Sequence, residues 1–104
     1  MSYRVTVRRG PKVERDRCAS LDEAIELAKR HVRGARRRDD VEALGRRYES
    51  ANLIATRIEL KGPDGRAGLD VRGDGSIVAY SGRVVRKALD GDDPYEALRR
   101  ALTA

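Results

Sequence analysis

Apolar and polar residues alternate along two stretches of the chain, and this alternation constrains the fold more than any other feature. In residues 3–8 the apolar members are Tyr3, Val5 and Val7, and in residues 52–60 one side carries Ile54, Thr56, Ile58 and Leu60. A period of two is typical of a β-strand with one buried face. The sequence therefore predicts strands that each bury one face only.

The segment after the first strand indicates a hairpin. Gly10-Pro11 ends the first alternation, and residues 13–18 can pair back as a second strand. Charges of both signs occupy both faces of that segment, which suits a strand at the edge of a sheet. We expect a hairpin whose second strand, residues 13–18, lies at a sheet edge or on the surface.

A helix is predicted directly after this hairpin. Ser20 followed three residues later by Glu23 is a capping-box pattern, in which two side chains satisfy backbone amides at a helix start. Gly34 is a suitable end, so the helix should cover about residues 21–33. Its apolar residues recur at helical spacing and are Leu21, Ala24, Ile25, Ala28 and Val32.

A second cap pattern predicts a helix at the C-terminus. Asp93 precedes Pro94, whose missing amide costs nothing at the first helical position, and Glu96 lies three residues after the cap. The buried stripe of this helix consists of Tyr95, Leu98 and Leu102.

Between the helices the sequence predicts a three-strand meander. Ala67, Leu69 and Val71 alternate with other residues, and Asp74-Gly75 suits a two-residue hairpin turn, because both turn positions need positive φ. With that turn, Val71 pairs with Val78 and Leu69 pairs with Tyr80 on one face.

Two stretches allow more than one interpretation. In residues 35–50, Val41, Leu44 and Tyr48 fit a short helix capped by Asp39, although Gly45 weakens it. Residues 83–89 suit either a strand or a short helix.

These elements predict a single α+β domain over residues 1–104, with the order β-β-α-β-β-β-α and two main helices packed on one face of an antiparallel sheet. Leu, Ile and Val occupy 22 of the 104 positions, and Phe and Trp are absent. The core is therefore small, and a homodimer interface is one way to complete it.

Basic residues are concentrated in the first half of the chain. Residues 1–47 hold 14 basic and 8 acidic side chains, whereas residues 48–104 hold nine of each. The densest run predicts a surface for nucleic-acid phosphates, formed by Arg30, Arg33, Arg36, Arg37, Arg38, Arg46 and Arg47. The alternative is a solvated surface, because Arg supplies 19 of the 23 basic residues and acidic residues follow the run directly.

The sequence offers no catalytic arrangement. Cys18 and His31 are the Cys/His candidates, but they lie near opposite ends of the predicted helix, about 16 Å apart. One Cys and one His cannot form a zinc site, and no phosphate-binding loop motif is present. We therefore expect no enzyme activity, no cofactor and no metal.

Two hypotheses on function remain. The first is a small non-enzymatic binding module, self-associating, whose basic surface binds nucleic-acid phosphates. The second is a protein-interaction or homodimerisation module without a nucleic-acid role. The sequence has neither a stretch of about 20 apolar residues nor a secretory signal, so we expect a cytoplasmic protein without a membrane partner.

Overall fold

The computed structural model describes residues 2–34, 41–43, 46–48, 54–82, 87–89 and 91–103, with the backbone alone for 41–43 and 46–48. The main sheet contains β1 (Tyr3–Arg9), β2 (Lys12–Cys18), β5 (Ile54–Lys61), β6 (Arg66–Arg72), β7 (Ile77–Ser81) and β8 (Lys87–Ala88). The helices are α1 (Leu21–Arg33) and α2 (Pro94–Thr103). A separate two-stranded sheet pairs β3 (Val41–Ala43) with β4 (Arg46–Tyr48).

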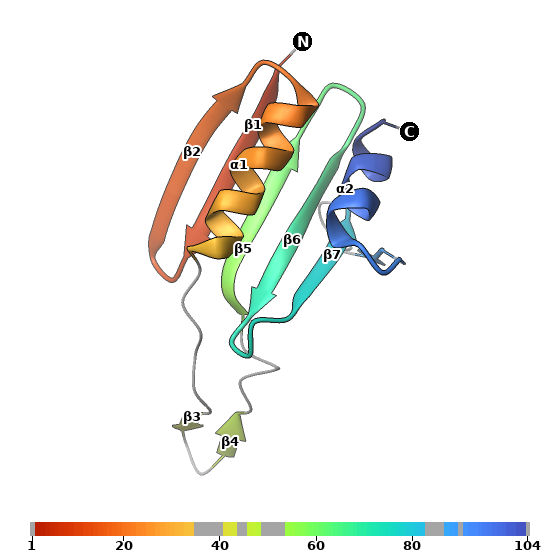
Figure 1. Ribbon diagram of the computed structural model, residues 1–104. Coiled ribbons are helices and arrows are strands. Elements are labelled where there is room, and N and C mark those ends of the chain that lie inside the picture. The colour runs from red at the N-terminus through yellow and green to blue at the C-terminus, as the bar shows by residue number, and fades with distance from the viewer. Residues whose placement is uncertain are drawn as a thin grey trace.

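The main sheet is antiparallel, with the strand order β2-β1-β5-β6-β7-β8. Both helices lie on the same face, where α1 packs on β1, β2 and β5, and α2 packs on β6 and β7 (Figure 1). The predicted α+β fold, the edge position of β2 and the β5-β6-β7 meander are confirmed. Residues 87–88 form an additional strand, whereas residues 83–86 lie outside the described residues.

The core lies between the helices and this covered face of the sheet. Its largest fully buried apolar side chains are Val5, Val7, Ile58, Leu60, Leu69, Leu98 and Leu102. Each such side chain contributes about 1.5–3 kcal/mol relative to an exposed position. The alternation predicted for β1 and for Thr56, Ile58 and Leu60 on β5 thus places these side chains against the helices.

Both predicted helix starts are confirmed by their hydrogen bonds. The Ser20 hydroxyl accepts from the backbone amide of Glu23 at 3.2 Å, and the Glu23 carboxylate accepts from the amide of Ala19 at 3.1 Å. At α2, the Asp93 carboxylate accepts from the amide of Tyr95 at 2.9 Å. These contacts satisfy backbone donors that have no partner within the helix.

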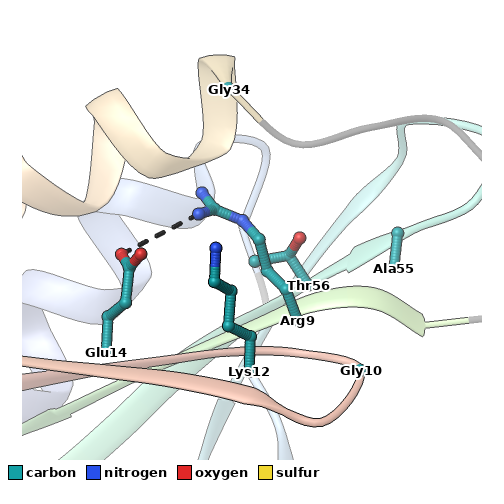
Figure 2. Close-up of a pocket in the computed structure, with 7 residues that line it drawn as sticks. All are labelled: Arg9, Gly10, Lys12, Glu14, Gly34, Ala55 and Thr56. Carbon is teal, nitrogen blue, oxygen red and sulfur yellow. Dashed lines mark ion pairs between the residues drawn. The ribbon is translucent and has the colours of Figure 1, made fainter.

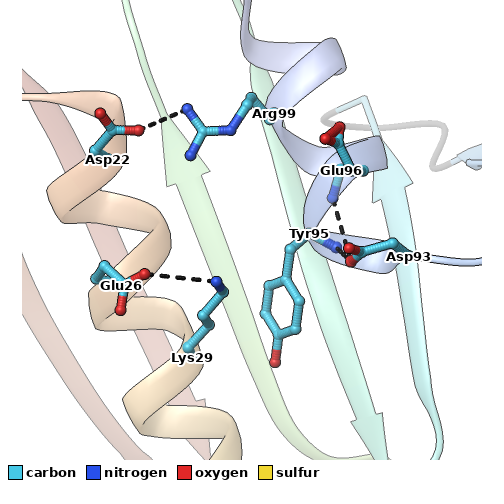
Figure 3. A network of polar contacts seen from close by, with 7 residues as sticks. All are labelled: Asp22, Glu26, Lys29, Asp93, Tyr95, Glu96 and Arg99. Carbon is cyan, nitrogen blue, oxygen red and sulfur yellow. Dashed lines mark hydrogen bonds and ion pairs between the residues drawn. The ribbon is translucent and has the colours of Figure 1, made fainter.

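Polar contacts link the two helices above the core (Figure 3). Asp22 on α1 forms an ion pair of 2.7 Å with Arg99 on α2. Lys29 lies 5.3 Å from the centre of the Tyr95 ring and 3.5 Å from the Glu26 carboxylate. Exposed pairs of this kind contribute at most about 1 kcal/mol, so they orient the helices while apolar burial holds them.

The predicted register of the β6–β7 hairpin is wrong by one residue. Val71 faces Ile77, and Leu69 faces Ala79. The cause is a loop of three residues, since the amide of Arg72 donates to the carbonyl of Ser76 at 2.8 Å and Gly75 takes a φ of 90°. Val78 and Tyr80 therefore lie on the face of the sheet opposite to the core.

The short helix predicted within residues 35–50 is also wrong where the structure describes that segment. β3 and β4 pair there, and Val41 faces Tyr48. A β-branched residue opposite an aromatic one favours a sheet, whereas a glycine such as Gly45 costs a helix about 1 kcal/mol. Asp39, the predicted cap, lies outside the described residues.

Candidate nucleic-acid interface

The face of the main sheet turned away from both helices, here called the open face, is strongly basic. The buried residues of β1 and β5 point to the core, so the residues between them point to the open face. Cross-strand pairing extends this face over β2 and β6. Eight basic side chains lie on it: Arg4, Arg8, Arg15, Arg17, Arg57, Lys61, Arg66 and Arg72.

The two acidic side chains that these four strands place on the open face, Glu59 and Asp70, are already paired. Asp70 binds Arg57 through two hydrogen bonds of 2.7 and 3.2 Å, which raise the pKa of the Arg57 guanidinium. Glu59 lies 3.4 Å from Arg66. In the described part of the chain, no ion pair reaches the remaining group of Arg4, Arg8, Arg15, Arg17 and Lys61. The open face therefore presents an excess of positive charge to solvent.

Tyr80 lies on the open face but is only 3% exposed. Its hydroxyl lies over Gly68, where a Cβ atom would collide with it, and the Arg57 guanidinium lies 5.9 Å from the ring centre. A ring with so little exposed surface offers no platform for a nucleic-acid base. Among the residues whose side chains are described, no tyrosine is exposed. The face is suited to anionic groups more than to stacking.

Apolar side chains border the basic area. Val13 is 37% exposed and opposes Arg8, and Ile54 is 40% exposed and opposes Arg72. Ile54 was expected on the covered face with Thr56, but a register shift between these two residues turns it out of the core. An irregularity of this kind re-aims one side chain while the rest of the strand keeps its face.

The described residues of the sequence-predicted site do not lie on this face. Arg30 and Arg33 are exposed on α1, which lies on the covered side of the sheet. Arg36, Arg37 and Arg38 lie outside the described residues, and the side chains of Arg46 and Arg47 in β4 do as well. Only Arg30 and Arg33 of the predicted patch are therefore placed, and both lie on the side of the sheet opposite to the open face.

The open-face arginines are not consecutive in the sequence, so the density of basic residues along the chain does not indicate them. A strand turns every second side chain to one face, so a basic surface in a sheet arises from residues two apart. Arg4 and Arg8 on β1, and Arg15 and Arg17 on β2, follow this spacing. Counting charge on the polar positions of each predicted strand would have found them.

A pocket of about 650 Å³ lies at the end of α1 (Figure 2). Figure 2 shows Arg9, Lys12 and Glu14 pointing from the β1–β2 hairpin toward Gly34. Arg9 donates to the carbonyl of His31 at 3.3 Å and lies 3.9 Å from Glu14. Because Arg9 satisfies a carbonyl at the helix C-terminus, its role is structural.

Cys18 and His31 have different surroundings and different partners. Cys18 is buried in the core, and burial raises the pKa of its thiol, with Glu23 and Asp16 adding to the shift. The His31 Nδ1 atom lies 3.1 Å from the Arg9 guanidinium. A buried, protonated thiol is a poor nucleophile.

Within the described residues, no three His, Cys, Asp or Glu side chains group as metal ligands. No helix described by the structure combines the length and apolar character needed to cross a bilayer. Comparison with protein-family models, curated proteins and solved structures gives no match to this chain.

Proposed function

We propose that the chain is a small non-enzymatic module that binds nucleic acid through phosphate contacts made by the open face. One observation carries this proposal: eight basic side chains share a sheet face of β2, β1, β5 and β6 on which the two acidic side chains, Glu59 and Asp70, are already paired. A surface built only for solubility needs no such segregation, because charges of both signs then intermix.

Binding of this kind is electrostatic. Lys and Arg that contact phosphates release condensed counterions, so affinity falls steeply with salt. Arginine forks donate two parallel hydrogen bonds to phosphate oxygens, and Arg supplies seven of the eight basic residues on the face. Because Tyr80 is covered, bases gain little by unstacking onto this face. The favoured ligand is therefore a duplex, bound with little sequence preference.

The alternative function is protein interaction or homodimerisation, and the edge strand β2 is its best candidate surface. All residues of β2 except Cys18 are exposed, so its outer edge can pair with another strand. An antiparallel register that pairs all seven residues with a second copy sets Arg15 against Arg15 and Glu14 against Asp16. Like charges in direct opposition disfavour that dimer, and we place this function second.

The test compares two matched triple variants by fluorescence anisotropy with a labelled mixed-sequence duplex. Substitution of Arg4, Arg8 and Arg15 by Gln should weaken binding by more than about 100-fold at low salt and reduce the salt slope by about one per lost contact. Substitution of Arg36, Arg37 and Arg38 by Gln should change binding less than about tenfold.

The reverse result would assign binding to the basic run of residues 30–47 and refute the open face as the interface. Equal binding by both variants and the wild-type chain would refute phosphate recognition by either surface. Light scattering at about 50 mM and about 500 mM salt adds the last control. A dimer that persists at both concentrations and ignores the duplex supports the interaction module instead.

A further inference from the structure

A hollow lies at one end of the open face, beside the β5–β6 turn. It is lined by Ser2, Arg4, Arg17, Lys61, Gly62 and Pro63 and has a volume of about 310 Å³. In Figure 1 this is the end of the sheet at which the N-terminus is marked. Three of the six lining residues are basic, and none is acidic.

The sheet register forces these cations together. Arg4 faces Arg17 on β2 and Lys61 on β5, so it has a basic residue on each side. Side chains in direct opposition have Cβ atoms about 5 Å apart, and like charges at that separation destabilise a sheet. Lys61 in turn faces Arg66 on β6. The row thus runs across four strands, about 14 Å in all.

Within the described residues, no acidic side chain, including Asp64 in the β5–β6 turn, forms an ion pair with Arg4, Arg17 or Lys61. Glu59 is engaged by Arg66 at 3.4 Å, at the far end of the row. The side chains of Glu14 and Asp16 on β2 point to the other face, because Asp16 faces the buried Val5. Arg4, Arg17 and Lys61 are all exposed, so their donors remain open to an anion from solvent.

The hollow has a rigid wall. The amide of Gly62 donates to the carbonyl of Gly65 at 2.9 Å, which closes the β5–β6 turn. The Tyr3 ring covers Gly62 from the core side so closely that a Cβ atom would collide with it. Donors for an anion therefore come from the three basic side chains and from Ser2, while the turn limits the hollow on one side.

We propose that this hollow binds a phosphomonoester group, which, resting on the proposed function, is the terminal phosphate of a nucleic-acid strand. A phosphomonoester carries a charge of about −1.5 to −2 at pH 7. Each phosphodiester of the nucleic-acid backbone carries one negative charge. Three cations in one hollow favour the more highly charged group. The repulsion within the row is then relieved by the ligand rather than by the fold.

The experiment uses two duplexes that differ only in a 5′-terminal phosphate, with the label on the opposite end. The wild-type chain should bind the phosphorylated duplex about tenfold more tightly. Lys61→Glu should abolish this difference and should raise Tm by about 2–6 °C, because a carboxylate then faces both Arg4 and Arg66. Gain of stability with loss of discrimination separates a ligand site from a structural role.

Arg15→Gln is the matched control, since Arg15 lies on the same strand and face as Arg17 but outside the hollow. It should weaken both duplexes equally and keep their ratio, whereas Arg17→Gln should lower the ratio. A third arm titrates inorganic phosphate against chloride at equal ionic strength and follows the amide resonances of residues 2, 4, 17 and 61. Saturable shifts there should disappear in Lys61→Glu.

Different experimental outcomes refute the phosphate site and the proposed nucleic-acid function. If the duplexes bind equally well and Arg17→Gln behaves like Arg15→Gln, the hollow is not a phosphate site, and the open face remains an interface. If inorganic phosphate binds in the hollow but neither duplex binds, the nucleic-acid function is refuted and the phosphate site stands. Failure of duplexes and of phosphate alike overturns both.

Discussion

The two faces of the main sheet are built from the same strands and differ in almost every property. The covered face of β1 and β5 carries Val5, Val7, Ile58 and Leu60, each at most 2% exposed. On the same strands the open face carries four basic residues, Arg4, Arg8, Arg57 and Lys61, together with Thr6 and Glu59. The covered face is uniform in chemistry because it must exclude water. The open face is free of that demand, so its bias toward one charge calls for another explanation.

The difference separates the residues that stabilise this small domain from those that are available to bind a ligand. Apolar burial on the covered face supplies the favourable free energy of folding. The row of like charges on the open face works against folding by a smaller amount. A feature that costs stability and serves no packing is a reasonable place to look for a ligand. Substitutions that change the charge or the packing of one face test this view.

The largest effect is expected from placing a charge on the covered face. Val71→Lys should prevent folding, because Val71 is 3% exposed and an unpaired buried ammonium costs about 3–5 kcal/mol or more. Val78→Lys is the control, since Val78 faces Asp70 on the open face and should keep wild-type stability within about 1 kcal/mol. Circular dichroism and urea denaturation measure both. Equal destabilisation would contradict the register of the β6–β7 hairpin.

A cavity on the covered face should have the next largest effect. Leu98 on α2 is fully buried, so Leu98→Ala should lower the free energy of unfolding by about 2–5 kcal/mol. The exposed Arg15 on the open face should tolerate Arg15→Ala within about 0.5 kcal/mol. The midpoints of urea unfolding give the comparison. A loss under about 1 kcal/mol for Leu98→Ala would mean that α2 is not essential to the core.

Substitution of Asp70 should have an intermediate effect, which lowers stability but increases the salt slope of duplex binding. Asp70→Asn removes the two-bond contact to Arg57 and should lower stability by about 1–2 kcal/mol. It also releases one positive charge on the open face, so the salt slope of duplex binding should rise by up to about one. Ser76→Ala, which alters a polar contact in the exposed turn, should leave the slope unchanged. Weaker binding by Asp70→Asn would argue that Asp70 organises the interface.

The smallest effect concerns Cys18, on the covered face. Burial raises the pKa of its thiol. At pH values below the ordinary thiol pKa, the thiol is therefore protonated in both the folded and the unfolded chain. As pH rises through that pKa the unfolded chain ionises first, and stability should then fall with increasing pH. Iodoacetamide at about pH 8 should modify the folded protein at least about tenfold more slowly than the urea-unfolded one. Cys18→Ala should remove the alkaline loss of stability that the thiol contributes.

Local chemistry explains which parts of the fold follow from sequence. The caps at Ser20 and Asp93 are determined within four residues, and strand alternation within six, so these elements were predicted correctly. The β6–β7 register depends on whether a loop has two or three residues, and Gly73-Asp74-Gly75 satisfies both turn types. The β3–β4 pair depends on contacts between two short segments. The three apolar residues of this stretch fit a short helix as well, so their pattern does not decide between the two structures.

The site was harder to predict than the fold. Consecutive arginines attract notice in a sequence, whereas Arg4, Arg17 and Lys61 become neighbours only through the pairing of three strands. Lys61 lies far from the other two along the chain, and nothing local links them. A cluster of this kind requires the sheet order as well as the strand positions.

The position of β1 between β2 and β5 also bears on how the chain folds. β1 pairs with β2 through a short turn, but its other partner, β5, lies about half the chain away in sequence. The β1–β2, β5–β6 and β6–β7 hairpins are local, so joining β1 to β5 carries the largest loop-closure entropy. Substitutions where Val7 faces Ile58 should therefore slow refolding, whereas changes in the β6–β7 loop should act mainly on the unfolding rate.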